Sequence, residues 1–183
     1  MKKDYYKGEG FWNADSKYKR IEYRINDEII KKAEGILDVI LPQSFIDLMK
    51  IQNGGELNFP YFMLPEGDTE SIPYGERQRL PSIEPIHFED DDVSILSSIE
   101  LLKEVNLLQE FIVLWNDFHY WLVLDYRNGS HHPSVLYIAE NFSTSDTQWE
   151  YIKLADNFDE FLKQLFRVPF IDPKQLNGSY GRK

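Results

Sequence analysis

The sequence of 183 residues contains no cysteine. Disulfide bonds, cysteine-ligated zinc sites and thiol nucleophiles are therefore excluded. Long apolar runs are also missing, because no run approaches the roughly 18 residues that a membrane-spanning helix needs. The basic start of the chain leads to no apolar segment of the kind found in signal peptides. We therefore expect a cytoplasmic protein that does not bind membranes.

Positive charge is scarce as well. The chain has 20 lysines and arginines against 31 aspartates and glutamates, which gives a formal net charge of −11. Binding to nucleic acid or to an anionic membrane needs a basic surface, so the sequence predicts neither. The acidic balance favours either a basic protein partner or simple solubility, and charge alone leaves both open.

Motifs that carry chemistry are few. The histidines show no His-Glu-x-x-His spacing, and no Gly-x-Ser-x-Gly motif surrounds Ser130. The neighbouring His131 and His132 favour a polar turn over a metal site, because adjacent side chains on a turn usually diverge. We therefore expect no catalytic residue, no cofactor and no metal, and an enzyme using Asp125, His131 and His132 is the alternative.

The clearest structural pattern is a hairpin in the middle of the chain. Two apolar runs, 111–115 and 119–126, are joined by a short polar spacer and predict two antiparallel strands. In the second run one set of alternating residues is wholly apolar, and the other is apolar until it ends at Asp125. We expect this strand to be central, with Asp125 anchoring the following turn through hydrogen bonds to its backbone.

Helices are predicted near both ends of the chain. Asn26 is a good N-cap, and apolar residues recur at helical spacing after it, at Ile29, Ala33, Ile36, Leu37 and Ile40. A second helix begins at Pro42, and we expect the glycines at 54 and 55 to cap its end. The last helix is predicted from Asp156, its N-cap, to Pro169.

Strands, a loop and one further helix are predicted between these helices. We expect strands at 56–59, 61–64, 82–88, 134–139 and 149–154, a long exposed loop at 65–81, and a helix that opens with a capping box at 97–100. Successive strands with helices grouped apart indicate an α+β fold with a mostly antiparallel sheet. The predicted units are an N-terminal arm packed on the core (1–24), one domain (25–168) and a polar tail (169–183).

Exposed carboxylates are the candidate partner-binding residues. Four of them are contiguous, and a contiguous run lacks the spaced ligands and glycine turn of a calcium loop. The alternatives for this run are a solvated loop and a patch that steers a basic protein. The candidate residues are Glu66, Asp68, Glu70, Glu76, Glu89, Asp90, Asp91 and Asp92.

Two motifs resemble those of the SUKH superfamily, which includes fungal cell-wall-assembly regulators of the SMI/KNR type and many bacterial immunity proteins. The first is the Leu-Pro to Asn-Gly-Gly segment at 41–55. The second is the Trp-x-x-Leu-Asp-Tyr strand at 121–126 with the Pro-x-Val strand from Pro133. The resemblance covers 25–166. Bacterial relatives often carry a glycine in the turn before the Trp strand, where this chain has residues 116–118, and we expect Asn and Asp to adopt the positive φ there.

This resemblance implies an α+β fold with a central, curved, mostly antiparallel sheet flanked by helices. It also implies a non-enzymatic protein. Bacterial members are antidotes that bind and block secreted polymorphic toxins, often nucleases, so the implied partner is a cognate toxin, which we expect to be basic. The fungal relatives imply an alternative role as a regulatory scaffold. The shared residues are expected to be scaffold: Leu41, Pro42, Asn53, Gly54, Gly55, Trp121 and Asp125.

Overall fold

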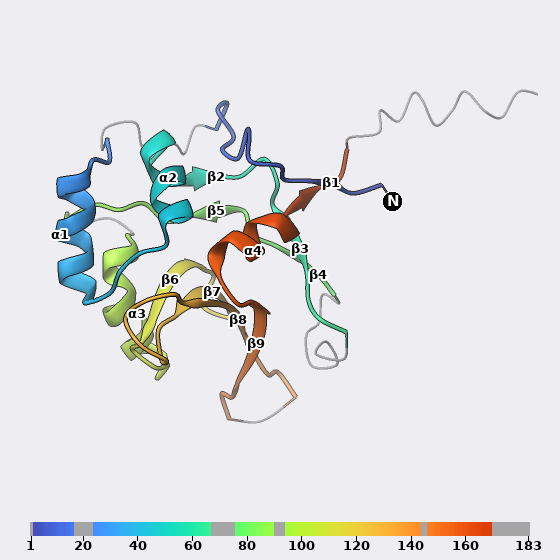
Figure 1. Cartoon of the computed structure of the whole chain (residues 1–183). Coiled ribbons are helices and arrows are strands. Elements are labelled where there is room, and N and C mark those ends of the chain that lie inside the picture. The colour runs from blue at the N-terminus through green and yellow to red at the C-terminus, as the bar shows by residue number, and fades with distance from the viewer. Residues whose placement is uncertain (1, 17–23, 67–75, 90–93, 144–145, 170–183) are drawn as a thin grey trace, which may run out of the picture.

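The computed structural model describes residues 2–16, 24–66, 76–89, 94–143 and 146–169. Within them the chain forms four α-helices, one short 3-10 helix and ten strands in three antiparallel sheets (Figure 1). The prediction of an α+β fold with antiparallel sheets is confirmed. The expectation of one central sheet is too simple, because two smaller sheets accompany the large one.

The large sheet is a meander of four consecutive strands. They are β6 (Phe111–Asn116), β7 (Tyr120–Asp125), β8 (Ser134–Glu140) and β9 (Trp149–Ala155), in that spatial order. The predicted hairpin is the β6–β7 pair, whose register joins Phe111 to Asp125. Register shifts in β6 and between β8 and β9 mark irregularities of the bulge type, which bend a sheet.

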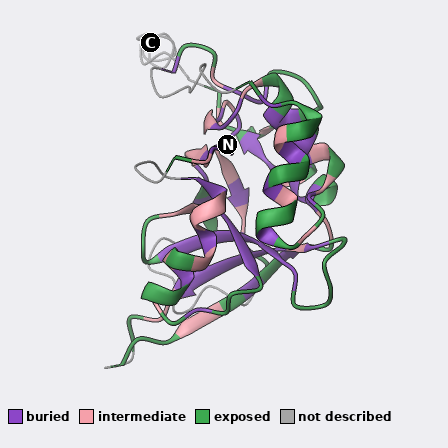
Figure 2. Ribbon diagram, turned by 90° about the vertical axis from the view of Figure 1, so that its left-hand side faces the viewer, coloured by how far each residue is buried: buried purple, intermediate pink, exposed green. Residues whose placement is uncertain are grey.

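Both faces of strand β7 are buried, which the apolar alternation predicts for a central strand. Leu122 and Leu124 face the larger core, where the helices α1, α2 and α4 contribute side chains. Trp121 and Val123 face a second core with Leu102 of α3. Figure 2 shows the buried strands in the interior and the exposed outer faces of the helices. The strand is therefore the shared wall of two cores.

Helix α1 (Asp27–Leu37) begins where the sequence predicts, because the Asn26 side chain accepts a hydrogen bond from the backbone of Ile29. Its predicted buried face is partly wrong. Ala33 and Leu37 are buried, but Ile36 and Ile40 are about half exposed, and Ile30 takes the buried position instead. The helix stops at Asp38, which adopts a left-handed conformation, so the chain turns before Ile40.

Helix α2 (Gln43–Ile51) follows Pro42, which is its N-cap. The predicted glycine cap is wrong, since the helix ends at Gln52 in an extended conformation. Gly54 instead allows two backbone segments to approach each other closely. Its φ is +75°, and a Cβ there would lie 2.8 Å from the backbone nitrogen of Pro85. Next to it, the buried Asn53 side chain donates to the carbonyl of Ile86 and accepts from its N–H, at 2.7 and 2.8 Å.

The small sheets join distant segments. One has the order β1 (Asp4–Tyr5), β10 (Phe166–Arg167), β3 (Tyr61–Met63) and β4 (Arg77–Arg79), and the other pairs β2 (Gly55–Glu56) with β5 (Ser82–Ile83). Strand β4 lies in the segment that was predicted as a loop. It forms an antiparallel pair with β3, so its backbone groups have hydrogen-bond partners. The strand predicted at 82–88 is only two residues long.

The neighbouring N-terminal arm is packed on the core. Phe11 and Trp12 are buried, and the Trp12 indole donates a hydrogen bond to the Leu48 carbonyl.

Two helix starts differ from their predictions. The capping box at Ser97 does not form, because the 3-10 helix η1 (Ile95–Ser97) precedes α3 (Ser98–Glu104) and Ser94 caps that turn instead. Helix α4 (Phe158–Gln164) is capped by Asn157 instead of Asp156, and it ends before β10, well short of Pro169. No helix in the described ranges is both long and apolar enough to cross a membrane.

Candidate functional site

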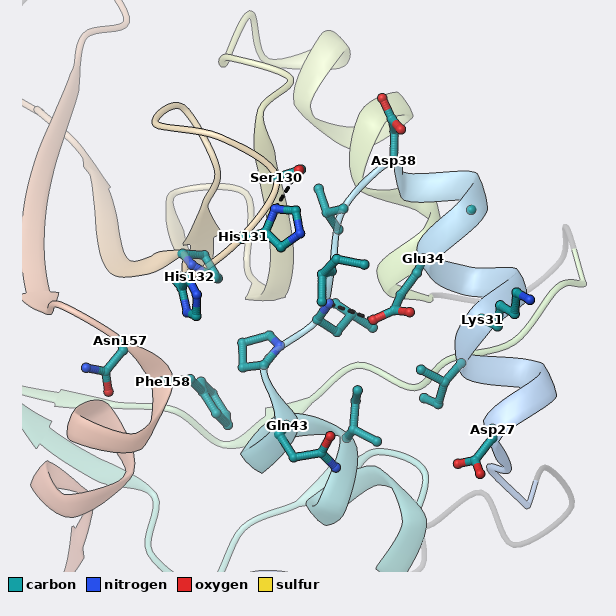
Figure 3. Close-up of a pocket in the computed structure, with 18 of the residues that line it drawn as sticks. Asp27, Lys31, Glu34, Asp38, Gln43, Ser130, His131, His132, Asn157 and Phe158 are labelled. Carbon is teal, nitrogen blue, oxygen red and sulfur yellow. Dashed lines mark hydrogen bonds between the residues drawn. The ribbon is translucent and has the colours of Figure 1, made fainter.

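A groove lies where α1, α2 and α4 meet the turn between β7 and β8 (Figure 3). Its volume is about 1080 Å³. Helix α1 and the connection to α2 form one wall. Residues 130–133 and the start of α4 form the other. The groove is large enough to receive a loop or side chains of another protein.

Three hydrogen bonds hold the α1–α2 connection in place. The Ile40 N–H donates to the carbonyl of Ser130 at 2.8 Å, and the Tyr126 hydroxyl donates to the carbonyl of Ile40 at 2.8 Å. The Leu41 N–H donates to the Glu34 carboxylate at 2.9 Å. Burial, with the charge of Glu34, raises the pKa of Tyr126 well above its usual value, so this hydroxyl stays a hydrogen-bond donor. The groove wall is thereby fixed to the large sheet.

Carboxylates outnumber basic groups along the groove. Four acidic side chains line it against two lysines, and these residues are Asp27, Glu34, Asp38, Asp159, Lys31 and Lys50. The Lys50 Nζ lies 2.6 Å from the Asp27 Oδ1. The hydrogen bond and the charge of Lys50 lower the pKa of the Asp27 carboxyl. The remaining acids give the groove a negative potential that suits a basic ligand.

Ser130 and His131 are the residues of the groove that most resemble a catalytic pair. The Ser130 hydroxyl and the His131 Nδ1 are 2.9 Å apart. They are sequence neighbours on an exposed turn, and the rings of His131 and His132 are 6.4 Å apart at 42°. No cluster of three or more potential metal-ligating side chains occurs in the part of the chain that the structure describes.

Asp125, which the enzyme alternative requires, belongs to a different site. Its carboxylate accepts hydrogen bonds from the Arg127 backbone and guanidinium at 2.8 to 3.1 Å. The hydroxyl of Ser134 also donates to it, at 3.4 Å. Asp125 is not among the residues that line the groove. The structure therefore does not bring the three residues of that alternative together.

The predicted partner-binding acids fall in two separate places. Glu66, Glu76 and Glu89 are exposed. The backbone carbonyl of Glu76 accepts a hydrogen bond from the Leu64 N–H beside the β3–β4 pair. Glu89 follows Phe88, whose ring lies under Lys32 of α1. Figure 1 shows α1 and the β3–β4 pair on opposite sides of the molecule. The other five lie outside the described residues: Asp68, Glu70, Asp90, Asp91 and Asp92.

The acidic lining of the groove was missed by the sequence analysis, although the sequence holds a signal for it. Asp27, Lys31, Glu34 and Asp38 follow one another at intervals of about one helical turn, so they share one face of α1. A contiguous run of acids is more conspicuous than a stripe of this kind. The stripe is nevertheless the one that faces a groove.

A comparison with protein families gives one match. The model of the family SUKH_6, described as SMI1-KNR4 cell-wall, matches residues 27–162. This region runs from the start of α1 into α4 and includes every strand of the large sheet. No curated protein and no solved structure matches the chain.

Proposed function

Because the chain belongs to the SUKH_6 (SMI1-KNR4) family, which is generally non-catalytic, we propose that it is an immunity protein that neutralises a cognate toxin by binding it. The toxin is a basic protein, a nuclease of the polymorphic type, and the binding takes place in the cytoplasm. Bacterial immunity proteins are one branch of the superfamily that the two sequence motifs resemble.

The excess of negative charge is the observation that carries this proposal. A net charge of −11 opposes binding to nucleic acid but favours association with a protein that itself holds phosphates. A nuclease concentrates positive charge around its substrate groove. An acidic protein that covers this groove excludes the nucleic acid and needs no chemistry of its own.

Two sets of acidic residues are candidates for this contact. The first set lines the groove beside α1 and includes Glu34, Asp38 and Asp159. The second set consists of the acids predicted from the sequence, in the segments 66–76 and 89–92. A standard protein interface buries about 1,600 Å² in total, so the toxin contact extends beyond any single loop.

The test is reconstitution with the toxin domain encoded beside this gene. We expect a stoichiometric complex in size-exclusion chromatography at low salt, and loss of toxin activity in that complex. Inhibition should be complete only when the chain is present in at least equal molar amount to the toxin, because the mechanism uses no catalysis. Failure to form a complex at low salt contradicts the proposal, and so does complete inhibition of the toxin by substoichiometric amounts of the chain.

A regulatory scaffold is the second candidate, and the family's description as SMI1-KNR4 cell-wall favours it. In that role the same acidic surfaces bind a cellular enzyme. Affinity purification of the full chain distinguishes the two functions. A main partner that is a housekeeping enzyme, with no toxin gene nearby, supports the scaffold.

A further inference from the structure

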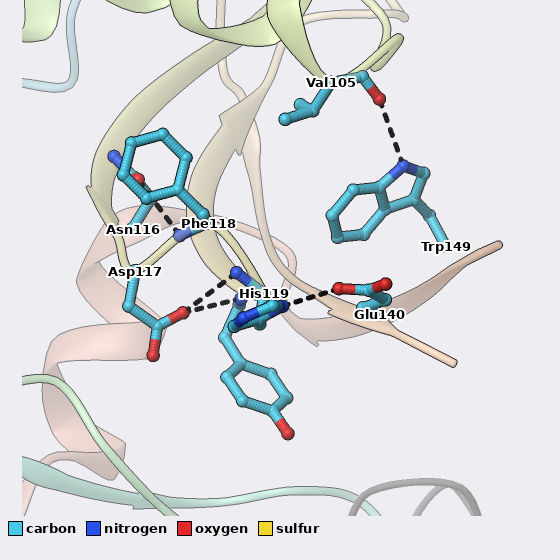
Figure 4. A network of polar contacts seen from close by, with 8 residues as sticks. Val105, Asn116, Asp117, Phe118, His119, Glu140 and Trp149 are labelled. Carbon is cyan, nitrogen blue, oxygen red and sulfur yellow. Dashed lines mark hydrogen bonds and ion pairs between the residues drawn. The ribbon is translucent and has the colours of Figure 1, made fainter. Parts of the chain in front are cut away.

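Exposed aromatic side chains gather at one end of the large sheet, away from the groove. Phe118 lies in the turn between β6 and β7, and Phe142 lies in the connection between β8 and β9. Their side chains are 57% and 52% exposed. Together with His119, whose ring lies beside that of Phe142, and with Trp149, we call these residues the aromatic tip. Figure 4 shows Phe118, His119 and Trp149.

The backbone of Phe118 has an unfavourable conformation. Its φ is +70°, in the left-handed region that bulky residues rarely adopt. Asn116 and Asp117, which tolerate this region better, do not take it. Glycine would relieve the strain, yet the chain has a large apolar residue at this position and leaves it exposed. Strain of this kind is often retained where a side chain has a binding role.

Hydrogen bonds from two polar side chains hold this turn. The Asn116 side-chain oxygen accepts from the Phe118 N–H at 3.3 Å, and the Asp117 carboxylate accepts from the N–H groups of His119 and Tyr120 at 3.2 and 2.8 Å. The Phe118 ring packs edge-on against the buried Trp121 ring, with centroids 6.4 Å apart. The exposed ring is therefore positioned before any partner arrives.

The second hairpin is tied to the first through His119. The imidazole Nδ1 lies 2.6 Å from the Glu140 carboxylate, and its ring lies 5.4 Å from the Phe142 ring. On the other side the Trp149 indole donates to the carbonyl of Val105 at 3.3 Å. The contacts of His119 join the two hairpins at this end of the sheet.

Acidic residues predominate in the segments that carry the aromatic tip. The described residues 116–120, 140–143 and 146–150 include Asp117, Glu140, Asp146 and Glu150 and no lysine or arginine. Exposed aromatic faces on acidic segments attract a cation with a flat apolar surface. The guanidinium of arginine fits this description better than the compact ammonium of lysine, because it is planar and stacks on rings.

We propose that the aromatic tip binds an arginine side chain of an extended, basic segment of the partner protein. Phe118 and Phe142 supply the stacking surface, and the four carboxylates supply the charge. This inference rests on the proposed function and deepens it, because the partner that carries the arginine is the proposed toxin. The recognition of arginine itself can be measured without the toxin.

The test uses the full chain and a short blocked peptide with two arginines separated by glycines. Peptides with lysine or with uncharged citrulline in place of arginine are the controls. In a ¹H–¹⁵N NMR titration, the amides of 116–120 and the Trp149 indole should shift with the arginine peptide, less with lysine and not with citrulline. Phe118→Gly and Phe142→Ala should each weaken this binding by about tenfold.

Stability measurements separate binding from folding. Phe118→Gly should leave the melting temperature unchanged or raise it, because glycine relieves the left-handed strain. Ile51→Ala is the matched control, since Ile51 is 76% exposed at the end of α2, on the far side of the molecule. It should leave peptide binding unchanged. A lower melting temperature in Phe118→Gly with full peptide binding overturns the proposal.

The remaining outcomes also decide the matter. Equal shifts with the citrulline peptide, shifts confined to the groove, or a second copy of the chain bound at the tip in sedimentation experiments would overturn it. If the toxin complex forms and Phe118→Gly does not weaken it, the aromatic tip fails while the proposed function stands. If the arginine peptide binds the tip but no toxin complex forms, the reverse holds.

Discussion

Asp125 shows how a single buried carboxylate organises its surroundings. Burial acts to raise its pKa, but the hydrogen bonds and the charge of Arg127 outweigh this effect and hold the pKa of the carboxyl below its usual value. The Arg127 guanidinium also lies over the rings of Phe111 and Tyr151. The sequence predicts the hydrogen bond from Asp125 to the turn backbone. It does not predict the arginine contacts, because they depend on how the strands lie beside one another.

Asp125→Asn should lower the free energy of unfolding by about 1–3 kcal/mol at pH 7, because the guanidinium loses its charged partner. A depressed folded-state pKa stabilises the protein fully above the unfolded value near 4, and this contribution is lost as the pH falls through the folded value. The difference between wild type and variant should therefore shrink as the pH falls below about 4. Urea denaturation across this pH range measures it.

Asp156→Asn is the control for that experiment. Asp156 also forms an ion pair, with Lys153, but its side chain is 74% exposed. Exposed pairs of this kind contribute about 0–1 kcal/mol, so this variant should stay close to wild type at every pH. A deficit for Asp125→Asn that stays constant down to pH 2 would show that its effect is not electrostatic.

The turn before the Trp strand is a residue-scale prediction that was wrong. The sequence places Asn116 and Asp117 where left-handed backbone is easiest, yet Phe118 has the positive φ. The two polar residues use their side chains to accept backbone hydrogen bonds instead. Propensity describes a residue alone, and it could not anticipate this division of roles.

At the scale of elements, two glycines have opposite roles. Gly54 has φ +75° and lies against Pro85 and Ile83, whereas Gly35 sits in α1 with nothing within 4 Å of a Cβ position. Gly54→Ala should destabilise the protein by roughly 2–4 kcal/mol, because β2 and β5 must separate. Gly35→Ala should stabilise it by about 0.5–1 kcal/mol, since alanine is the better helix former. Thermal unfolding of both variants measures the difference.

Equal effects of these two substitutions would contradict the close approach at Gly54. The melting temperatures should differ clearly, because about 1 kcal/mol corresponds to about 2–4 °C in a chain of this size. A Gly54→Ser variant provides a further check, as any Cβ should be as harmful as that of alanine.

Elements with a long periodic pattern were predictable from the sequence, and short ones were not. The four strands of the large sheet and helix α1 have enough residues for alternation or helical spacing to be visible. Strand β4 has one buried residue, Gln78, between two exposed arginines, so it has no apolar pattern. Its position follows from its pairing with β3, which sequence neighbours do not reveal.

At the scale of the whole molecule, the acidic groove follows from packing. Its two walls come from α1 and from a turn more than ninety residues later in the chain. The sequence shows the acidic stripe of α1 but not the surface opposite it. For the same reason the net charge could be read from the sequence, whereas the position of the acidic groove could not.

Net charge leads to a kinetic prediction for the toxin complex. The association rate constant should fall by about tenfold or more when the salt concentration rises from 0.05 to 0.5 M, because screening weakens the attraction between the two proteins. Dissociation should change less. Stopped-flow fluorescence of the chain's tryptophans measures both rates.

A variant with Glu66, Glu76 and Glu89 changed to glutamine provides the comparison for this experiment. If these exposed acids steer the toxin, the variant should associate more slowly at low salt and should depend less on salt. Rates that are independent of salt in both proteins would show that charge does not guide the encounter.

The pairing of β1 with β10 also has a consequence for the order of events during synthesis. Asp4 is opposite Arg167, so β1 cannot pair with β10 until β10 has been synthesised. At a translation rate of about 5–20 residues per second, the meander of β6 to β9 can emerge from the ribosome and pair while β1 is still without its neighbour. The small sheet then forms after the large one, when β10 pairs with β1.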